Sequence, residues 1–175
     1  MRKIGLISDT HGLLEERVFH HFQDCDEIWH AGDFGEGVAE QLREFKPMRG
    51  VYGNIDVNNL KLDFPEHQVF MCEGMKVWMT HIGAYPPNYN RKIKSLLNQC
   101  RPNLFICGHS HILRVMGDKA RGLWHINPGA AGNHGFHHIK TIMTICIHEG
   151  KLSDVKVIEL GKRGSIVGKT PTTAD

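Results

Sequence analysis

The order of apolar and polar positions in the first third of the chain predicts alternating strands and helices. Residues 2–8, 27–31 and 48–52 are short apolar runs with the length of buried strands. Between them, residues 12–23 and 36–45 place apolar side chains at helical spacing. Strands that alternate with helices in this way are typical of an α/β protein with a parallel sheet.

The rest of the chain is richer in strands. Two hairpins are expected, one around Gly74 and one around Gly150. The expected elements are strands at residues 68–73, 76–80, 103–107, 113–116, 122–125, 140–148 and 151–160, and one helix at residues 88–100. We therefore expect two packed sheets with helices outside, in one domain of residues 1–160. Residues 161–175 have the polar composition of a C-terminal tail.

Composition and charge exclude several classes of protein. The chain has 175 residues, of which 41% are hydrophobic and 23% charged, as in an ordinary globular domain. Its formal charge of +2 gives no argument for a nucleic-acid or membrane surface. No apolar run approaches the length of a membrane span or of a signal-peptide core. The five cysteines include no Cys-x-x-Cys pair, which favours reduced thiols in a cytoplasmic protein.

Five short polar segments carry the residue types that bind metal ions. They are Asp9-Thr10-His11, Gly32-Asp33, Gly53-Asn54, Thr80-His81 and Gly108-His109-Ser110-His111. Each follows a predicted strand, and α/β sheets bind ligands beyond the carboxyl ends of their strands. Residues two apart in extended backbone point the same way, so we expect each Asp-x-His or His-x-His pair to face one cleft. Carboxylate, imidazole and amide groups without thiolate suit manganese, iron, cobalt or zinc.

Each segment taken alone has a simpler structural interpretation. Asp9 could cap a helix that begins near Gly12, Asn54 could be a turn residue, and His81 could be an ordinary strand-end histidine. Five such segments, all at strand ends, favour a metal centre instead. Two divalent ions would outweigh the two carboxylates, so the centre would attract a phosphate.

These segments resemble those of the calcineurin-like metallophosphoesterase superfamily, especially its small single-domain phosphodiesterases from bacteria and archaea. The matching segments are SDTHG (8–12), HAGD (30–33), GNID (53–56), THIG (80–83), GHSH (108–111) and NPG (127–129). The resemblance implies a four-layer αββα sandwich of two mixed sheets flanked by helices. It also implies two divalent transition ions per chain, with manganese first and zinc, iron, cobalt or nickel as alternatives.

The resemblance assigns roles to seven residues. One ion would be held by Asp9, His11, Asp33 and His111. The other would be held by Asp33, Asn54, His81 and His109, so that Asp33 bridges the pair. Water between the ions would attack phosphorus, and Asp33, Asn54 and His81 would be catalytic as well as ligands.

The activity implied is that of a metal-dependent phosphodiesterase acting on a small phosphoester. A non-catalytic metal-binding interaction module is the first alternative. A phosphomonoesterase, a nucleotide pyrophosphatase or a nuclease of the same fold is the second, although the balanced charge weighs against duplex nucleic acid. The physiological substrate is left open by the sequence, and a homo-oligomer is possible.

Two positions depart from the family pattern. Many members have a histidine directly after the metal-binding asparagine, where it helps to protonate the leaving group, and small members often have cysteine. This chain has Ile55 there, and Ala130 stands where serine usually follows the Asn127–Gly129 loop. We interpret His30 as a strand-end residue or as a residue that orients a ligand. The cluster of His134, His137 and His138 is interpreted as an exposed loop or the start of a strand.

Overall fold

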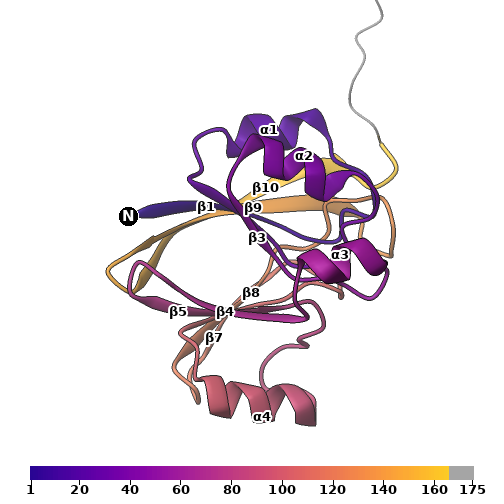
Figure 1. Ribbon diagram of the computed structural model, residues 1–175. Coiled ribbons are helices and arrows are strands. Elements are labelled where there is room, and N and C mark those ends of the chain that lie inside the picture. The colour runs from indigo at the N-terminus through magenta and orange to yellow at the C-terminus, as the bar shows by residue number, and fades with distance from the viewer. Residues whose placement is uncertain (166–175) are drawn as a thin grey trace, which may run out of the picture.

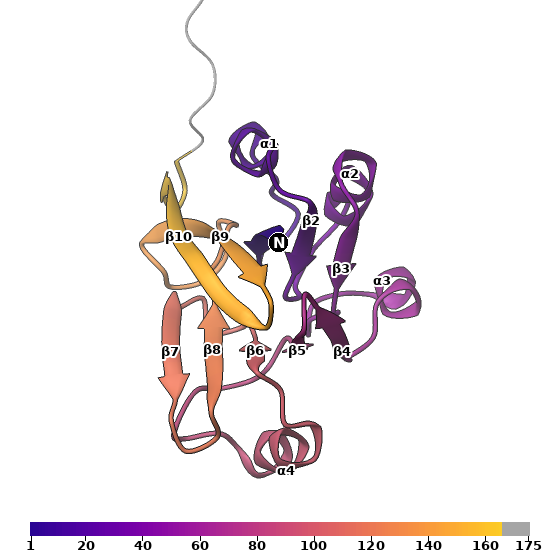
Figure 2. The same cartoon turned by 90° about the vertical axis from the view of Figure 1, so that its left-hand side faces the viewer.

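Two five-stranded sheets pack face to face in the computed structural model, which describes residues 1–165 (Figure 1). The elements are β1 (Arg2–Ile7), α1 (Glu16–Phe22), β2 (Glu27–His30), α2 (Val38–Phe45), β3 (Met48–Gly50), α3 (Asn58–Asp63), β4 (His67–Cys72), β5 (Met75–Thr80), α4 (Arg91–Cys100), β6 (Leu104–Ile106), β7 (Arg114–Asp118), β8 (Leu123–Asn127), β9 (Ile139–His148) and β10 (Lys151–Lys162). The strand orders are β10-β9-β1-β2-β3 and β4-β5-β6-β8-β7. Figure 2 shows the two sheets with β10 over β7 at one edge and β3 over β4 at the other.

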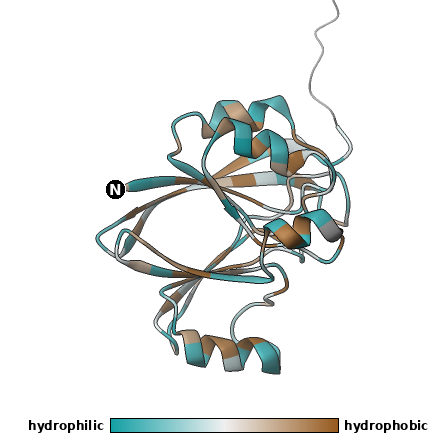
Figure 3. Cartoon of the chain, in the orientation of Figure 1, coloured by the Kyte–Doolittle hydropathy of each residue, from teal (hydrophilic) through white to brown (hydrophobic). Residues whose placement is uncertain are grey.

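Three apolar clusters hold the layers together. The first lies between the sheets and includes Leu6 and Ile106. The second joins α1 and α2 to the first sheet through Phe22 and Leu42, and the third joins α4 to the second sheet through Leu97. In Figure 3 strands of both sheets carry brown, hydrophobic stretches, and buried residues of these strands form the first cluster. Both sheets combine parallel and antiparallel pairs, so the predicted αββα sandwich of two mixed sheets is confirmed.

The burial of individual strands explains their sequences. Each of the eight residues 140–147 of β9 is buried, because helices cover one face of its sheet and the second sheet covers the other. Such a strand needs apolar side chains on both faces and loses the alternation of a half-exposed strand. β9 is therefore a fully covered strand beside β1, whose carboxyl end carries Asp9 and His11.

The observed elements differ from those expected at several boundaries and by one additional helix. α1 begins at Glu16 rather than near residue 12, because Gly12 has a φ of +81° and Leu13 N closes a turn onto Thr10 O at 2.9 Å. α3 was not expected, since six residues show too little apolar periodicity. β10 extends to Lys162, two residues beyond the expected end of the domain. Residues 166–175 of the expected tail lie outside the described residues.

The helices within residues 1–165 are all too short or too polar to cross a bilayer.

Candidate metal centre

The carboxyl ends of five strands meet at one edge of the sandwich. β1, β2 and β3 are parallel neighbours in one sheet, and β5 and β6 are parallel neighbours in the other. The segments that follow these strands carry all seven predicted ligands, which are Asp9, His11, Asp33, Asn54, His81, His109 and His111. In Figure 1 these segments lie toward the right-hand side, where α3 also lies.

Most of the predicted ligand atoms form two compact groups. Within each group, one carboxylate oxygen and two imidazole nitrogens lie within 4.8 Å of one another. The first group is Asp9, His11 and His111, and the second is Asp33, His81 and His109. Asp33 Oδ2 lies 3.2 Å from His81 Nε2 in its own group and 3.6 Å from His11 Nε2 in the other. Asp33 therefore lies between the groups.

Asn54 joins the second group. Its Oδ1 lies 3.1 Å from Nε2 of His81, and in the first group Asp9 Oδ1 lies 3.1 Å from Nε2 of His111. Two ligand atoms at adjacent corners of an octahedron, each about 2.1 Å from an ion, would be about 3 Å apart. These separations fit ligands that share an ion.

Two of these ligand atoms are buried without a hydrogen bond. They are Asp9 Oδ1 and His11 Nε2, judged over the residues that the structure describes. A buried polar atom without a partner costs about 1–3 kcal/mol. The other oxygen of Asp9, Oδ2, accepts hydrogen bonds from Ser8 Oγ at 2.6 Å and His109 N at 3.1 Å. One oxygen is thus fixed by the protein while the second faces the neighbouring imidazoles, an arrangement that fits a divalent cation.

Five of the seven predicted ligands have left-handed backbone conformations. The φ angles of Asp9, His11, Asp33, His109 and His111 are 54°, 48°, 56°, 65° and 58°. Such conformations cost of order 1–3 kcal/mol each in residues other than glycine, and they cluster at functional sites. The two pairs of ligands that are two residues apart do converge, but the expectation that they do so in extended backbone was wrong.

Burial and charge set the protonation of the predicted ligands. Burial lowers the pKa of His11 and of His109 despite the nearby carboxylates. Burial opposes the charged form of Asp33, but the hydrogen bond and charge of His81 outweigh it and lower the pKa of that carboxyl. Burial also opposes the charged form of His81, yet its hydrogen bond to Asp33 and the charges of Asp33 and Asp9 raise its pKa. Neutral imidazole and ionised carboxylate are the forms that bind metal, so a proton on His81 would compete with a cation.

His30 connects by hydrogen bonds the two segments that carry Asp9, His11 and Asp33. Its Nδ1 accepts a hydrogen bond from Gly32 N at 3.1 Å, so its Nε2 carries the hydrogen and donates to Thr10 Oγ1 at 2.9 Å. Thr10 Oγ1 in turn donates to Phe34 O at 2.7 Å. Burial lowers the pKa of His30 to about 3, which keeps the ring neutral. His30 therefore acts on the backbone of these segments through Thr10 and Gly32.

Asn127 fixes the segment of His109 and His111 from the neighbouring strand β8. This buried side chain donates from Nδ2 to Gly108 O at 2.8 Å and to Ser110 Oγ at 3.1 Å. Its Oδ1 accepts from Gly129 N at 2.9 Å. The Asn127–Gly129 loop thus lies beside the candidate centre, as the family resemblance implied.

The histidine-rich loop before β9 also reaches the candidate centre. The ring centroid of His134 lies 5.1 Å from that of His11, and that of His137 lies 5.3 Å from that of His111. His137 Nε2 lies 2.9 Å from Gly132 O, which closes the loop on itself. A loop was one of the two expectations for this cluster. Contact of this loop with the centre was the less favoured expectation, because the contact depends on how β9 is placed beside β1.

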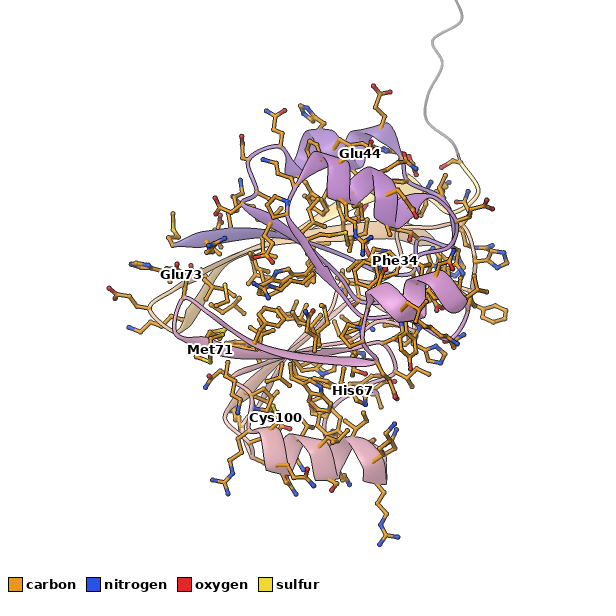
Figure 4. The ribbon with its side chains drawn as sticks, in the orientation of Figure 1. Phe34, Glu44, His67, Met71, Glu73 and Cys100 are labelled. Carbon is orange, nitrogen blue, oxygen red and sulfur yellow. The ribbon has the colours of Figure 1, made fainter. Side chains whose placement is uncertain are left out.

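A cavity of about 370 Å³ lies beside the second group. Asn54 and His81 line it, together with residues from the loop after β3, from α3, from β4 and β5, and from the start of α4. Figure 4 shows His67, another lining residue, on the side of the second sheet that faces α4. Sequence motifs did not identify this cavity, because its walls come from segments that carry no recognisable spacing.

A four-layer sandwich with carboxylate, imidazole and amide groups gathered at its strand ends has the architecture of a metal-dependent hydrolase. Residues 2–150 match the family model of the calcineurin-like phosphoesterase superfamily domain, and the chain belongs to this family. A probable metallophosphoesterase of Methanothermobacter thermautotrophicus is 30% identical over 135 residues, which cover 73% of this chain and 76% of the relative. The family implies a phosphoester hydrolase that uses divalent metal ions.

Solved structures agree with this fold. A Streptococcus pneumoniae protein described as a predicted phosphoesterase has a TM-score of 0.67 at 23% identity, covering 91% of this chain and 89% of that one. Wild type Vps29 complexed with zinc from Entamoeba histolytica has a TM-score of 0.69 at 18% identity, covering 90% of this chain and 98% of that one. At these identities the similarity establishes the fold alone.

Proposed function

We propose that this protein is a binuclear metal-dependent phosphodiesterase whose ligands are the seven residues brought together at the strand ends. The position of Asp33 carries the proposal, because its Oδ2 lies within 3.6 Å of imidazole nitrogens from both ligand groups. One ion would be bound by Asp9, His11, Asp33 and His111. The other would be bound by Asp33, Asn54, His81 and His109.

The chemistry of the ligand set favours manganese, with zinc, iron, cobalt or nickel as alternatives. When bound, a pair of divalent ions supplies the charge that polarises phosphoryl oxygens and makes an attacking hydroxide from water near neutral pH. Vps29 from Entamoeba histolytica, which has a similar fold, was solved in complex with zinc, and this is consistent with a divalent ion in this protein.

The protein's own groups position the reacting parts. Asn54 directs Oδ1 toward His81 Nε2, which leaves Nδ2 able to donate to a phosphoryl oxygen. Ile55 offers no side-chain proton donor, and its backbone N–H donates instead to Asp33 Oδ1 at 3.0 Å. Substrates whose leaving group departs without a proton should therefore be hydrolysed fastest. This favours esters with aryl leaving groups over esters with alkyl leaving groups.

Metal analysis and turnover of the same preparation test this function. The purified protein should bind about two ions per chain and hydrolyse bis(p-nitrophenyl) phosphate. Asp33→Ala and His81→Ala should each lose at least about 100-fold in kcat/KM, because each removes a metal ligand. His148→Ala, which removes a half-exposed histidine at the β9–β10 turn, should not.

The alternatives give different results. Two bound ions without turnover across a broad phosphoester panel would indicate a non-catalytic interaction module. Faster hydrolysis of p-nitrophenyl phosphate than of the diester would indicate a phosphomonoesterase.

We also propose a small phosphoester substrate and a cytoplasmic location. All five cysteines are free, which is consistent with a reducing compartment. A formal charge of +2 offers little electrostatic affinity for duplex nucleic acid.

A further inference from the structure

Exposed apolar side chains occur directly after three of the predicted ligands and in the loop before β9. Ile55, Ile82 and Ile112 are 42%, 47% and 47% exposed, and each directly follows a predicted ligand in the sequence. Phe136 is 98% exposed and lies in the loop whose histidines pack against His11 and His111. Single exposed apolar residues are ordinary, but Ile82 also lines a cavity. We call these four residues the apolar collar.

One residue of the apolar collar, Ile82, lines the cavity beside the second ligand group. Tyr52 and Ile93 add further apolar surface to the wall of this cavity. Asn54 and His81 line the same cavity, so a molecule held there reaches the candidate centre. A volume of about 370 Å³ lies at the small end of the range for ligand pockets.

The charged side chains around the cavity, Lys61, Glu66 and Lys92, already have partners. Lys92 Nζ donates to Glu66 Oε1 at 2.8 Å. Burial lowers the pKa of His67, and its Nε2 has no hydrogen-bond partner among the described residues. Lys61 Nζ lies 5.4 Å from the centroid of the Tyr52 ring, within the range of a cation–π contact. A charged ligand group would have to compete with these contacts. An apolar group would leave them in place, and the transfer of its surface out of water would favour binding.

We propose that this cavity binds the ester group that remains on phosphorus, and that the protein selects phosphodiesters in which this group is an apolar alkyl or aryl group. The inference rests on the proposed phosphodiesterase function, because it places phosphorus beside Asn54 and His81. It identifies the class of substrate that the same centre hydrolyses. Ile82 is then a specificity-determining residue, since it lies directly after His81 and within the cavity wall.

Kinetics with a homologous series test the selectivity. The substrates are p-nitrophenyl methyl, butyl and hexyl phosphate, acting on the manganese-loaded protein. All three release p-nitrophenolate, so differences in kcat/KM report the retained alkyl group. Burial of each methylene can raise affinity by at most about fourfold, and we expect kcat/KM for the hexyl ester to exceed that for the methyl ester by at least about tenfold. Equal values with active protein would overturn the selectivity and leave the phosphodiesterase function standing.

Two serine substitutions at equally exposed apolar positions locate the selectivity. Ile82→Ser should lower the hexyl-to-methyl ratio of kcat/KM by at least about threefold, because it removes apolar surface from the cavity. Val69→Ser is the control, since Val69 is 49% exposed on β4 and does not line this cavity. The ratio within each variant cancels any general loss of metal or activity. An equal fall of the ratio in both variants would overturn the assignment to this cavity.

A binding measurement separates this inference from the proposed function. Methylphosphonate and hexylphosphonate are not hydrolysed, and each can be titrated into manganese-loaded protein by calorimetry. Tighter binding of hexylphosphonate, with a negative heat-capacity change, is expected from apolar burial. If that preference appears without any turnover, the function fails and the cavity assignment stands. Equal affinity for the two phosphonates would overturn the assignment of the retained ester group to this cavity.

Discussion

Gly135 packs directly against the imidazole of His111. Its φ is +108°, and a Cβ atom at this position would overlap Nδ1 of that ring. The opposite nitrogen, His111 Nε2, lies 3.1 Å from Asp9 Oδ1. The loop before β9 therefore contacts the Nδ1 side of the His111 ring and orients its Nε2 toward Asp9.

Gly135→Ala should weaken metal binding by displacing His111. Loss of a group that orients a ligand typically lowers metal affinity by about 10–100-fold, and we expect a value in this range. Titration of the metal-free protein with manganese measures the affinity. Gly122→Ala is a matched control, because Gly122 also has a positive φ of 64° but no atom within 4 Å of an added Cβ. Similar losses in both variants would show that backbone strain rather than contact with His111 is responsible.

Asn127→Ala should destabilise the protein and loosen the segment of His109 and His111. The hydrogen bonds with Gly108 O, Ser110 Oγ and Gly129 N are lost, and the buried carbonyl of Gly108 loses the donor that it has from this side chain. We expect a fall of about 1–3 kcal/mol in the free energy of unfolding, measured by urea denaturation of the metal-free protein. Asn103→Ala removes an exposed hydrogen bond to Lys76 N and should cost less. The reverse order would contradict the role assigned to Asn127.

The sequence located the strands and the seven predicted ligands because both depend on local pattern. A buried strand such as β1 is visible as an apolar run, and the polar residues after it stand out against that run. The left-handed conformation of Asp9 and His111 has no comparable signal, since nothing in an Asp-x-His or His-x-His spacing distinguishes it from extended backbone. The contact of Gly135 with His111 and the cavity beside His81 depend on distant segments and required the three-dimensional structure.

His111→Gly should leave the stability of the metal-free protein unchanged or higher, and it should reduce the additional stability that bound metal provides. Glycine adopts the φ of 58° found at this position without strain, whereas histidine pays of order 1–3 kcal/mol for it. The metal-free variant should therefore unfold at a temperature no lower than that of the metal-free wild type. Addition of manganese should raise the melting temperature of the wild type by several degrees more than that of the variant.

Thermal unfolding of both proteins with and without manganese provides the measurement. A variant that is much less stable than the wild type in the absence of metal would mean that the His111 ring contributes more packing than strain. An equal rise with manganese in both proteins would remove His111 from the ligand set.

His125→Phe should reduce the loss of stability at acid pH. Burial lowers the pKa of His125 to about 4, from an ordinary value of about 6.5 in the unfolded chain. Below pH 6.5 the unfolded state therefore binds more protons at this residue than the folded state. The stability that depends on its neutral ring is complete above pH 6.5 and is lost as the pH falls toward 4.

Urea denaturation of the metal-free protein at pH 7 and pH 4.5 measures this difference. Removing the imidazole should abolish about 2–3 kcal/mol of the fall in unfolding free energy between these two pH values. Phenylalanine suits the position, because the rings of Tyr89 and Phe105 lie 6.1 and 5.3 Å from that of His125. His148→Phe replaces a half-exposed histidine and should leave most of the fall in place. If the His125→Phe protein lost as much stability as the wild type, burial of this ring would not be a source of the acid sensitivity.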